Sequence, residues 1–137
     1  MKRCILVTVL LAAFWGMAVS VSPRVGATAD ERVHLVGGYS YWKFNDYRLQ
    51  PENGNLAMRL QALPLLAMDL RFPSRDREDW QQARANDVGH VFLFGLGNPF
   101  ARMLTQARAV VALFGVLTAW LVWRWTRHLF GPAAGWL

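Results

Sequence analysis

Two adjacent carboxylates, Asp30 and Glu31, and a histidine shortly after them are the side chains of this sequence best suited to acid–base chemistry. Thr28 precedes Glu31 by three residues, which is the capping-box pattern of a helix start. A helix that begins here places Asp30 in its first turn, where free N–H groups and the helix dipole stabilise an ionised carboxylate. Residues four apart share one face of a helix, so this pattern predicts that His34 lies beside Asp30.

The same helix face continues through Gly37, Gly38 and Tyr41. Because glycine has no side chain, this spacing predicts a bare strip of backbone beside the acid and the imidazole. A sugar or a phosphate-linked ligand could approach such a strip closely. The non-catalytic interpretation is a surface helix whose acidic residues stabilise a capped start, with the histidine bonded to a carboxylate.

The chain is rich in apolar and aromatic residues, as membrane proteins are. Hydrophobic residues make up 54% of its 137 residues, and seven Trp and eight Phe are among them. Residues 4–22 form an almost uncharged run that is long enough to cross a bilayer, and residues 108–125 form a second one. Basic residues precede the first run and follow the second, so the positive-inside rule places both chain ends in the cytoplasm.

These runs predict an all-α integral membrane protein with two transmembrane helices joined by a long extracytoplasmic loop that contains interfacial helices. The predicted segments are a cytoplasmic N-terminus at 1–3, a transmembrane helix at 4–22, an extracytoplasmic loop with the Asp-Glu motif at 23–107, a transmembrane helix at 108–125, and a cytoplasmic turn with the start of a next helix at 126–137. In the loop, apolar residues at 56, 60, 63 and 67 predict a helix that lies along the membrane surface. The apolar run 90–97 is too short to cross, and we expect it to dip into the interface.

The first apolar run has a second interpretation, a secretory signal peptide. Such a peptide has the same basic start and apolar body, and Ala27-Thr28-Ala29 offers a cleavage site with small residues. The run is longer than the core of a signal peptide and contains Phe14 and Trp15. We therefore expect an uncleaved anchor helix.

The formal net charge of +6 and the pI near 10.4 suit either nucleic acid or anionic lipid as a partner. The basic residues are spread along the chain and concentrate at the edges of apolar runs, which favours membrane lipids and indicates no nucleic-acid partner. The single cysteine, Cys4, has no partner for an internal disulfide, and the histidines at 34, 90 and 128 do not have the spacing of metal ligands. The sequence therefore predicts no metal site and shows no evident cofactor.

One stretch of the sequence carries a family resemblance. The residues that carry it are Asp30-Glu31, His34, Gly38-Tyr39, Tyr41, Asp46-Tyr47-Arg48-Leu49, Pro51-Glu52 and Leu63-Pro64-Leu65-Leu66. Their order resembles the first external loop of bacterial lipid-carrier-dependent glycosyltransferases of the GT-C fold, a superfamily that includes dolichyl-phosphate-mannose protein mannosyltransferases and the aminoarabinose transferases of lipid A. Many members have Glu-His-Pro-Pro-Leu where this chain has Glu52-Asn53-Gly54-Asn55-Leu56, so the chain departs from the family pattern there.

The resemblance implies transfer of a sugar from a polyprenyl-phosphate carrier to an acceptor on the outer face of the bacterial cytoplasmic membrane. By motif position, Asp30 and Glu31 are the catalytic carboxylates, and Asp30 takes a proton from the acceptor hydroxyl. The residues expected to bind substrate are His34, Tyr41, Arg48, Glu52 and Arg108. Of these, the two arginines would balance the charge of the departing phosphate.

Several of these residues have a plainer interpretation. Tyr41 fits an interfacial aromatic belt, and Arg48 fits contact with lipid headgroups. Arg108 could pair with a carboxylate of the loop in place of a phosphate. Full-length members of the resembled family have many more transmembrane helices, and the apolar run after Pro132 simply ends, so we expect the chain to correspond to their N-terminal portion and to be inactive alone. The alternative function is a small non-catalytic membrane protein whose loop binds a partner or lipid headgroups.

Overall fold

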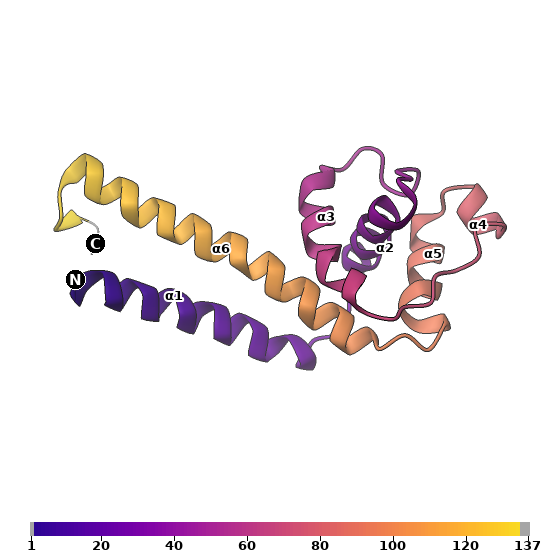
Figure 1. Ribbon diagram of the computed structural model, residues 1–137, viewed down its shortest axis with the longest axis horizontal. Helices are drawn as coiled ribbons and strands as arrows, with labels where there is room; N and C mark the ends of the chain where they lie inside the picture. The colour runs from indigo at the N-terminus through magenta and orange to yellow at the C-terminus, as the bar shows by residue number, and fades with distance from the viewer. Residues whose placement is uncertain (1, 135–137) are drawn as a thin grey trace.

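The computed structural model describes residues 2–134, and every regular element in that range is helical (Figure 1). The elements are α1 (Lys2–Val21), η1 (Ser22–Arg24), α2 (Ala29–Phe44), α3 (Asn55–Ala62), η2 (Leu63–Ala67), α4 (Glu78–Gln81), α5 (Ala85–His90), η3 (Val91–Gly95) and α6 (Phe100–Phe130). Here η1 and η2 are 3₁₀ turns and η3 is a π-helical turn. The predicted all-α class is therefore confirmed for the described residues. The predicted start of a further helix falls partly on residues 135–137, which lie outside them.

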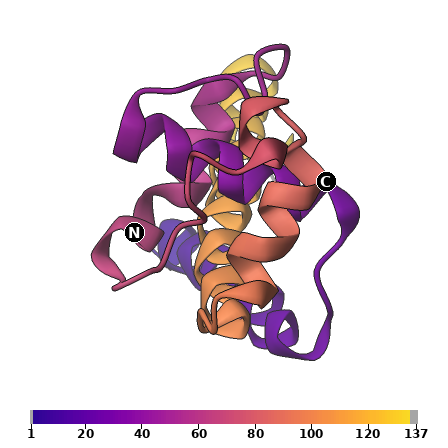
Figure 2. The same cartoon turned by 90° about the vertical axis from the view of Figure 1, so that its right-hand side faces the viewer.

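The molecule has two parts, which we call the helix pair and the head. The helix pair consists of α1 and residues 109–130 of α6, which run antiparallel beside each other (Figure 1). The head comprises residues 27–107 and lies at one end of the pair, and Figure 2 views the molecule from that end. Both described chain ends lie at the opposite end of the pair. The chain therefore runs outward along α1, folds into the head, and returns beside α1 in the second long helix, α6.

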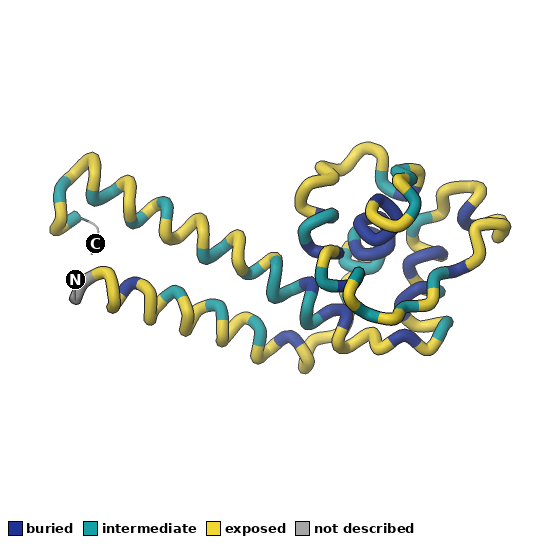
Figure 3. Tube along the Cα trace, in the orientation of Figure 1, coloured by how far each residue is buried: buried dark blue, intermediate teal, exposed yellow. Residues whose placement is uncertain are grey.

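The helix pair is apolar and almost entirely exposed. Both α1 with η1 and α6 are long and apolar enough to cross a membrane, yet only 6% of the most apolar window of each is buried within the protein. Figure 3 shows this exposure along both helices and contrasts it with the buried residues of the head. Contact between the two helices is specific, because the indole Nε1 of Trp15 donates a hydrogen bond of 2.9 Å to the carbonyl of Ala109.

The long helix α6 extends beyond the predicted second span, 108–125, at both ends. It begins at Phe100, and its first two turns belong to the head, where Met103, Leu104 and Ala107 are buried. Nothing in residues 100–107 breaks a helix, and their apolar face packs on the head core. One continuous helix therefore joins the head to the pair.

Helix α2 starts where the sequence predicts. The hydroxyl of Thr28 accepts a hydrogen bond from the backbone N–H of Glu31, and the Glu31 carboxylate accepts one of 2.9 Å from the backbone N–H of Thr28. This reciprocal pair confirms the capping box. The helix ends at Phe44, after which Asn45 adopts the left-handed conformation with φ of 50° and ends the helical path.

The glycines of α2 do not form an open strip, so the prediction of a ligand-accessible backbone there is wrong. A Cβ atom on Gly38 would lie 2.2 Å from the carbonyl oxygen of Met58, because α3 packs directly on this point of α2. Gly37 is buried beside Gln50, and Tyr41 is only 2% exposed. The missing side chains serve close helix–helix packing.

The head core is built around aromatic rings that pack on one another, mostly in tilted or T-shaped pairs. Tyr39, Phe44, Phe72, Trp80 and Phe92 have neighbouring ring centroids 4.9–6.1 Å apart. The apolar run 90–97 contributes to this core, since Phe92 and Leu93 are 0% exposed. The apolar character of these two residues serves packing inside the head, and the prediction that the run dips into a membrane interface stays a prediction.

A stripe of apolar residues on α3 and η2 remains on the surface. Leu56 is 67% exposed and Leu63 is 46% exposed, whereas Met58 and Ala62 on the other face of α3 are buried. In Figure 1, α3 lies on the side of the head that faces the helix pair and runs across the direction of α6. The periodicity at 56, 60, 63 and 67 thus marks an outward face and not a core face.

Candidate functional site

A groove of about 560 Å³ lies where the helix pair meets the head. One wall is apolar and comes from the helix pair, with Phe14, Ala18, Val111, Ala112 and Gly115. The other end is polar and is formed by Glu31, His34, Gln61 and Arg108. The groove therefore combines a hydrocarbon-lined channel with a small polar end, which is the combination that an amphipathic ligand requires.

Small residues open the apolar part of the groove. A Cβ atom on Gly115 would lie 3.1 Å from the ring of Phe14, so the aromatic ring of α1 rests directly on the backbone of α6. Ala18 and Ala112 also line the groove and have short side chains. Larger residues at these positions would fill the space between the two helices.

An ion pair between Glu31 and Arg108 closes the polar end. Nε of Arg108 lies 2.6 Å from one carboxylate oxygen of Glu31, and Nη2 lies 2.7 Å from the other. This bidentate geometry is the strongest form of the arginine–carboxylate interaction. The two side chains are 19% and 26% exposed, so the pair is largely shielded from water.

Arg108 also holds the connection between α1 and α2. Its Nη1 donates to the carbonyls of Ser22 and Val25 at 2.8 and 2.9 Å, and its Nη2 donates to that of Gly26 at 2.7 Å. With the two bonds to Glu31, all five N–H donors of the guanidinium have acceptors. Arg108 therefore fastens three segments together and has no N–H left for a phosphate. Of its two predicted partners, the loop carboxylate is the one observed.

The contacts of Glu31 are those of a positioning residue. The hydrogen bonds from Arg108 lower the pKa of the Glu31 carboxyl more than burial raises it, and the bond from Thr28 lowers it further. A carboxylate held ionised by two partners is a weak base. Its predicted catalytic role stays a prediction, while its observed contacts fix the start of α2 against α6.

His34 and Gln61 are the polar groups of the groove that are open to a ligand. His34 is half-buried, and within residues 2–134 the structure gives it no hydrogen bond or ion pair. The Gln61 side chain is largely buried in the wall and likewise has no protein partner in that range. Both can donate and accept hydrogen bonds at the mouth of the apolar channel.

Asp30 does not line this groove but directly precedes Glu31, which does. It is exposed in the first turn of α2, between the capping Thr28 and Glu31, and its carboxylate makes no ion pair or hydrogen bond with the described part of the chain. Helical spacing places it next to His34 on the same face. Of the two predicted catalytic carboxylates, Asp30 is the one free to accept a proton.

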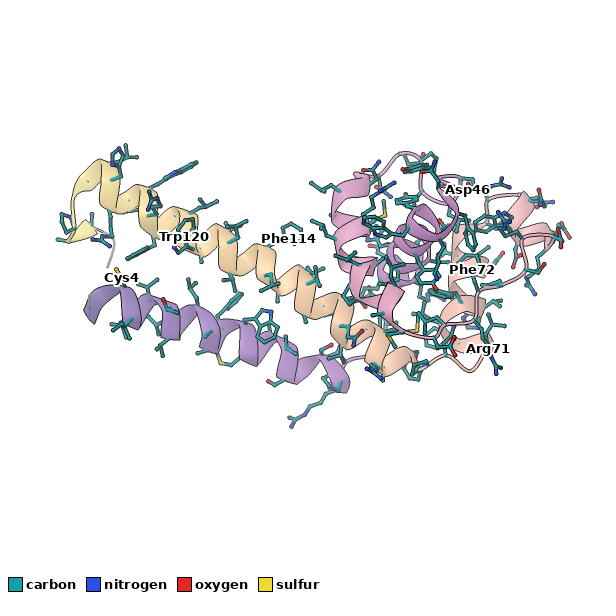
Figure 4. The ribbon with its side chains drawn as sticks, viewed as in Figure 1. Cys4, Asp46, Arg71, Phe72, Phe114 and Trp120 are labelled. Carbon is teal, nitrogen blue, oxygen red and sulfur yellow. The ribbon has the colours of Figure 1, made fainter. Side chains whose placement is uncertain are left out.

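The other three predicted substrate residues lie away from the groove. The hydroxyl of buried Tyr41 donates to the carbonyl of Gln50 at 2.6 Å. Arg48 pairs with Asp46 at 2.9 Å in its own turn, and Figure 4 labels Asp46 on the part of the head far from α1. Glu52 is exposed in the loop before α3. The structure thus brings together Glu31, His34 and Arg108, with Asp30 adjacent.

Gln61 and the small residues of the groove wall were missed by the sequence analysis. The signal for Gln61 is a polar residue that shares one face of α3 with buried Met58 and Ala62. For Ala18, Ala112 and Gly115 no motif exists, because small apolar residues are frequent in spanning helices.

The chain was compared with protein families, with curated proteins and with solved structures, and nothing matches it in any of the three. The resemblance to GT-C glycosyltransferases therefore rests on the residues quoted above.

Proposed function

We propose that the chain is anchored in a membrane by α1 and α6 and forms the N-terminal part of a glycosyltransferase that takes its sugar from a polyprenyl-phosphate carrier. The observation that carries this proposal is the groove at the junction of helix pair and head. Its apolar channel opens along the helix pair, and two residues of its polar end, Glu31 and His34, follow the exposed Asp30 by one and four positions on α2.

Membrane insertion is supported by the exposed apolar surface. Large side chains along both long helices are open to the surroundings, including Ile5, Leu10, Met17, Leu113, Leu117 and Val122. A water-soluble monomer rarely exposes a continuous apolar surface of this extent. The outward stripe of Leu56 and Leu63 also fits this arrangement, because α3 runs across the helix pair as an interfacial helix would.

A lipid carrier fits the composition of the groove. Isoprenoid units are hydrocarbon and would lie against Phe14, Val111 and Ala112 within the bilayer. The phosphate would then reach the polar end, where N–H groups of His34 and Gln61 can donate to its oxygens. The volume of about 560 Å³ lies in the usual range for pockets that hold small ligands.

The chemistry follows from the position of Asp30. Its carboxylate accepts the proton of the acceptor hydroxyl as the hydroxyl oxygen attacks the anomeric carbon of the sugar. The bond between that carbon and the phosphate oxygen breaks, and the phosphate leaves with the electron pair. Glu31 and Arg108 take no part in this step, but they fix the start of α2 so that Asp30 stays beside the groove.

Asp30→Asn in a membrane enzyme that contains this segment tests the proposal. The amide keeps the size of the side chain and removes its basicity, so we expect transfer from a polyprenyl-phosphate sugar to fall by about a hundredfold or more. Asp69→Asn is the matched control, since Asp69 is an exposed carboxylate that does not line the groove. Near-normal turnover of Asp30→Asn would refute the assigned base. Lipid binding without any transfer would favour the non-catalytic alternative.

A further inference from the structure

A second pocket, of about 690 Å³, lies at the end of the helix pair that is far from the head. We call it the end pocket. Cys4 and Thr8 of α1 and Trp120, Trp123, Arg124 and Arg127 of α6 are among its lining residues. Figure 4 labels Cys4 and Trp120 at this end of the pair. The pocket is separate from the groove at the head and shares no residue with it.

Positive charge in the end pocket has no acidic side chain to balance it. All nine Asp and Glu residues lie between positions 30 and 87, in the head. The guanidinium of Arg127 lies 4.7 Å from the ring centroid of Trp123, and that of Arg124 lies 5.7 Å from the centroid of Trp120. Contact with the rings orders both guanidiniums, and within residues 2–134 neither makes a hydrogen bond or ion pair, so their N–H groups can bind an anion.

The indole of Trp123 supplies an independent sign of a ligand. Its Nε1 atom is shielded from solvent, and within residues 2–134 no acceptor lies in hydrogen-bond range of it. Shielded donors in proteins are almost always paired, so an unpaired one calls for an acceptor that comes from outside the chain. Trp123 lines the same pocket as the two arginines. An oxygen-rich anion there would accept from the indole and from both guanidiniums.

An apolar groove continues from the end pocket along the two helices. It has a volume of about 490 Å³, and Leu11, Val116 and Leu117 are among its lining residues. Thr8 and Trp120 line both the end pocket and this groove, so the two spaces adjoin. An anion site joined to a hydrocarbon-lined groove fits the phosphate and acyl chain of a phospholipid better than it fits a free ion.

We infer that the end pocket binds the phosphate group of an anionic phospholipid whose acyl chain lies in the adjoining apolar groove. The site is independent of the proposed glycosyl transfer, because it lies at the opposite end of the helix pair. Bound lipid would hold α1 and α6 together at the end where the head cannot do so.

Native mass spectrometry of the whole chain in detergent, with phosphatidylglycerol or phosphatidylcholine added, tests this inference. We expect one retained phosphatidylglycerol per chain and about a tenfold preference over phosphatidylcholine, because both lipids carry the phosphate but the ammonium group of choline brings a positive charge close to the two guanidiniums. The double variant Arg124→Gln/Arg127→Gln should lose the preference. Trp123→Phe should weaken retention several-fold without changing the charge. Maleimide labelling of Cys4, the single cysteine, should slow when the lipid is bound.

Arg102→Gln, alone and together with Arg71→Gln, is the control, because the pair removes the same two positive charges from exposed positions outside the end pocket. Circular dichroism should show unchanged helix content in all variants. If the Arg102 control lost as much phosphatidylglycerol as the Arg124/Arg127 variant, or if Trp123→Phe retained it fully, retention would reflect general attraction by basic residues. Either result would contradict a specific site in the end pocket. Displacement of the lipid by inorganic phosphate at millimolar concentration would assign the site to a free anion and overturn the lipid assignment.

Discussion

Glu31→Gln weakens the ion pair that holds the head to the helix pair. The substitution keeps the shape of the side chain but leaves the Arg108 guanidinium without an opposite charge. Removal of one partner costs 3–5 kcal/mol for a fully buried pair and below about 1 kcal/mol for an exposed one. Because the side chains are 19% and 26% exposed, we expect a loss of about 2 kcal/mol in the free energy of unfolding. Arg108→Met should cost more, about 3 kcal/mol, because three backbone carbonyls also lose their donor.

Denaturant unfolding of Glu31→Gln, Arg108→Met and the double variant in detergent measures the coupling between the two side chains. The double variant should be less destabilised than the sum of the single variants by about 1.5 kcal/mol. The pair Glu78–Arg84 is the control, since its atoms are 3.5 Å apart and its side chains are 73% and 46% exposed, and its coupling should stay below about 1 kcal/mol. Additive effects at Glu31 and Arg108 would show that their contact does not fasten α2 to α6.

The same pair gives a pH dependence of defined sign. The pKa of Glu31 is lowered in the folded protein, so its contribution to stability is complete above the ordinary glutamate pKa and is lost as pH falls through the folded-state value. The wild-type protein should therefore lose stability on acidification below about pH 4 more steeply than Glu31→Gln does. Parallel curves for the two proteins would contradict the assigned cause of the shift.

Two further predictions concern packing and topology. Gly38→Ala should destabilise the head by about 3 kcal/mol or more, because the new Cβ would lie 2.2 Å from the Met58 carbonyl oxygen, whereas Gly16→Ala meets no atom within 4 Å and should be neutral or slightly stabilising in the same unfolding measurement. A topology reporter inserted near Ser74 should be active outside the cytoplasm and one fused to the C-terminus active inside it, and finding both on one side would remove the two-span arrangement.

Local signals in the sequence predicted local structure correctly. The capping box at Thr28 and Glu31 depends on residues close in sequence, and it is present. The two long apolar runs predicted two long helices, although α6 starts at Phe100 because its first turns also serve the head core. Such boundaries depend on what the helix packs against.

Long-range contacts explain what the sequence could not predict. Gly37 and Gly38 fit an open surface and a tight helix contact equally well until the position of α3 is known. Arg108 and Glu31 are 77 residues apart, and only the return of α6 past α2 brings them together. Asn98 is another case, since it bonds the backbone of Arg71 at 3.0 and 2.8 Å across the head without any motif that would reveal it.

Binding of a polyprenyl phosphate to the chain tests the central claim, that the groove at the head holds a lipid carrier. Native mass spectrometry with undecaprenyl phosphate should show one retained molecule per chain. Ala112→Trp fills the apolar channel and should lower retention about tenfold or more, whereas Ala119→Trp, at an exposed position of α6 outside the groove, should leave it unchanged. All of these measurements use the chain with Arg124→Gln and Arg127→Gln, because the end pocket would otherwise bind the same anionic lipid. Equal retention by the chains with and without Ala112→Trp would contradict the account.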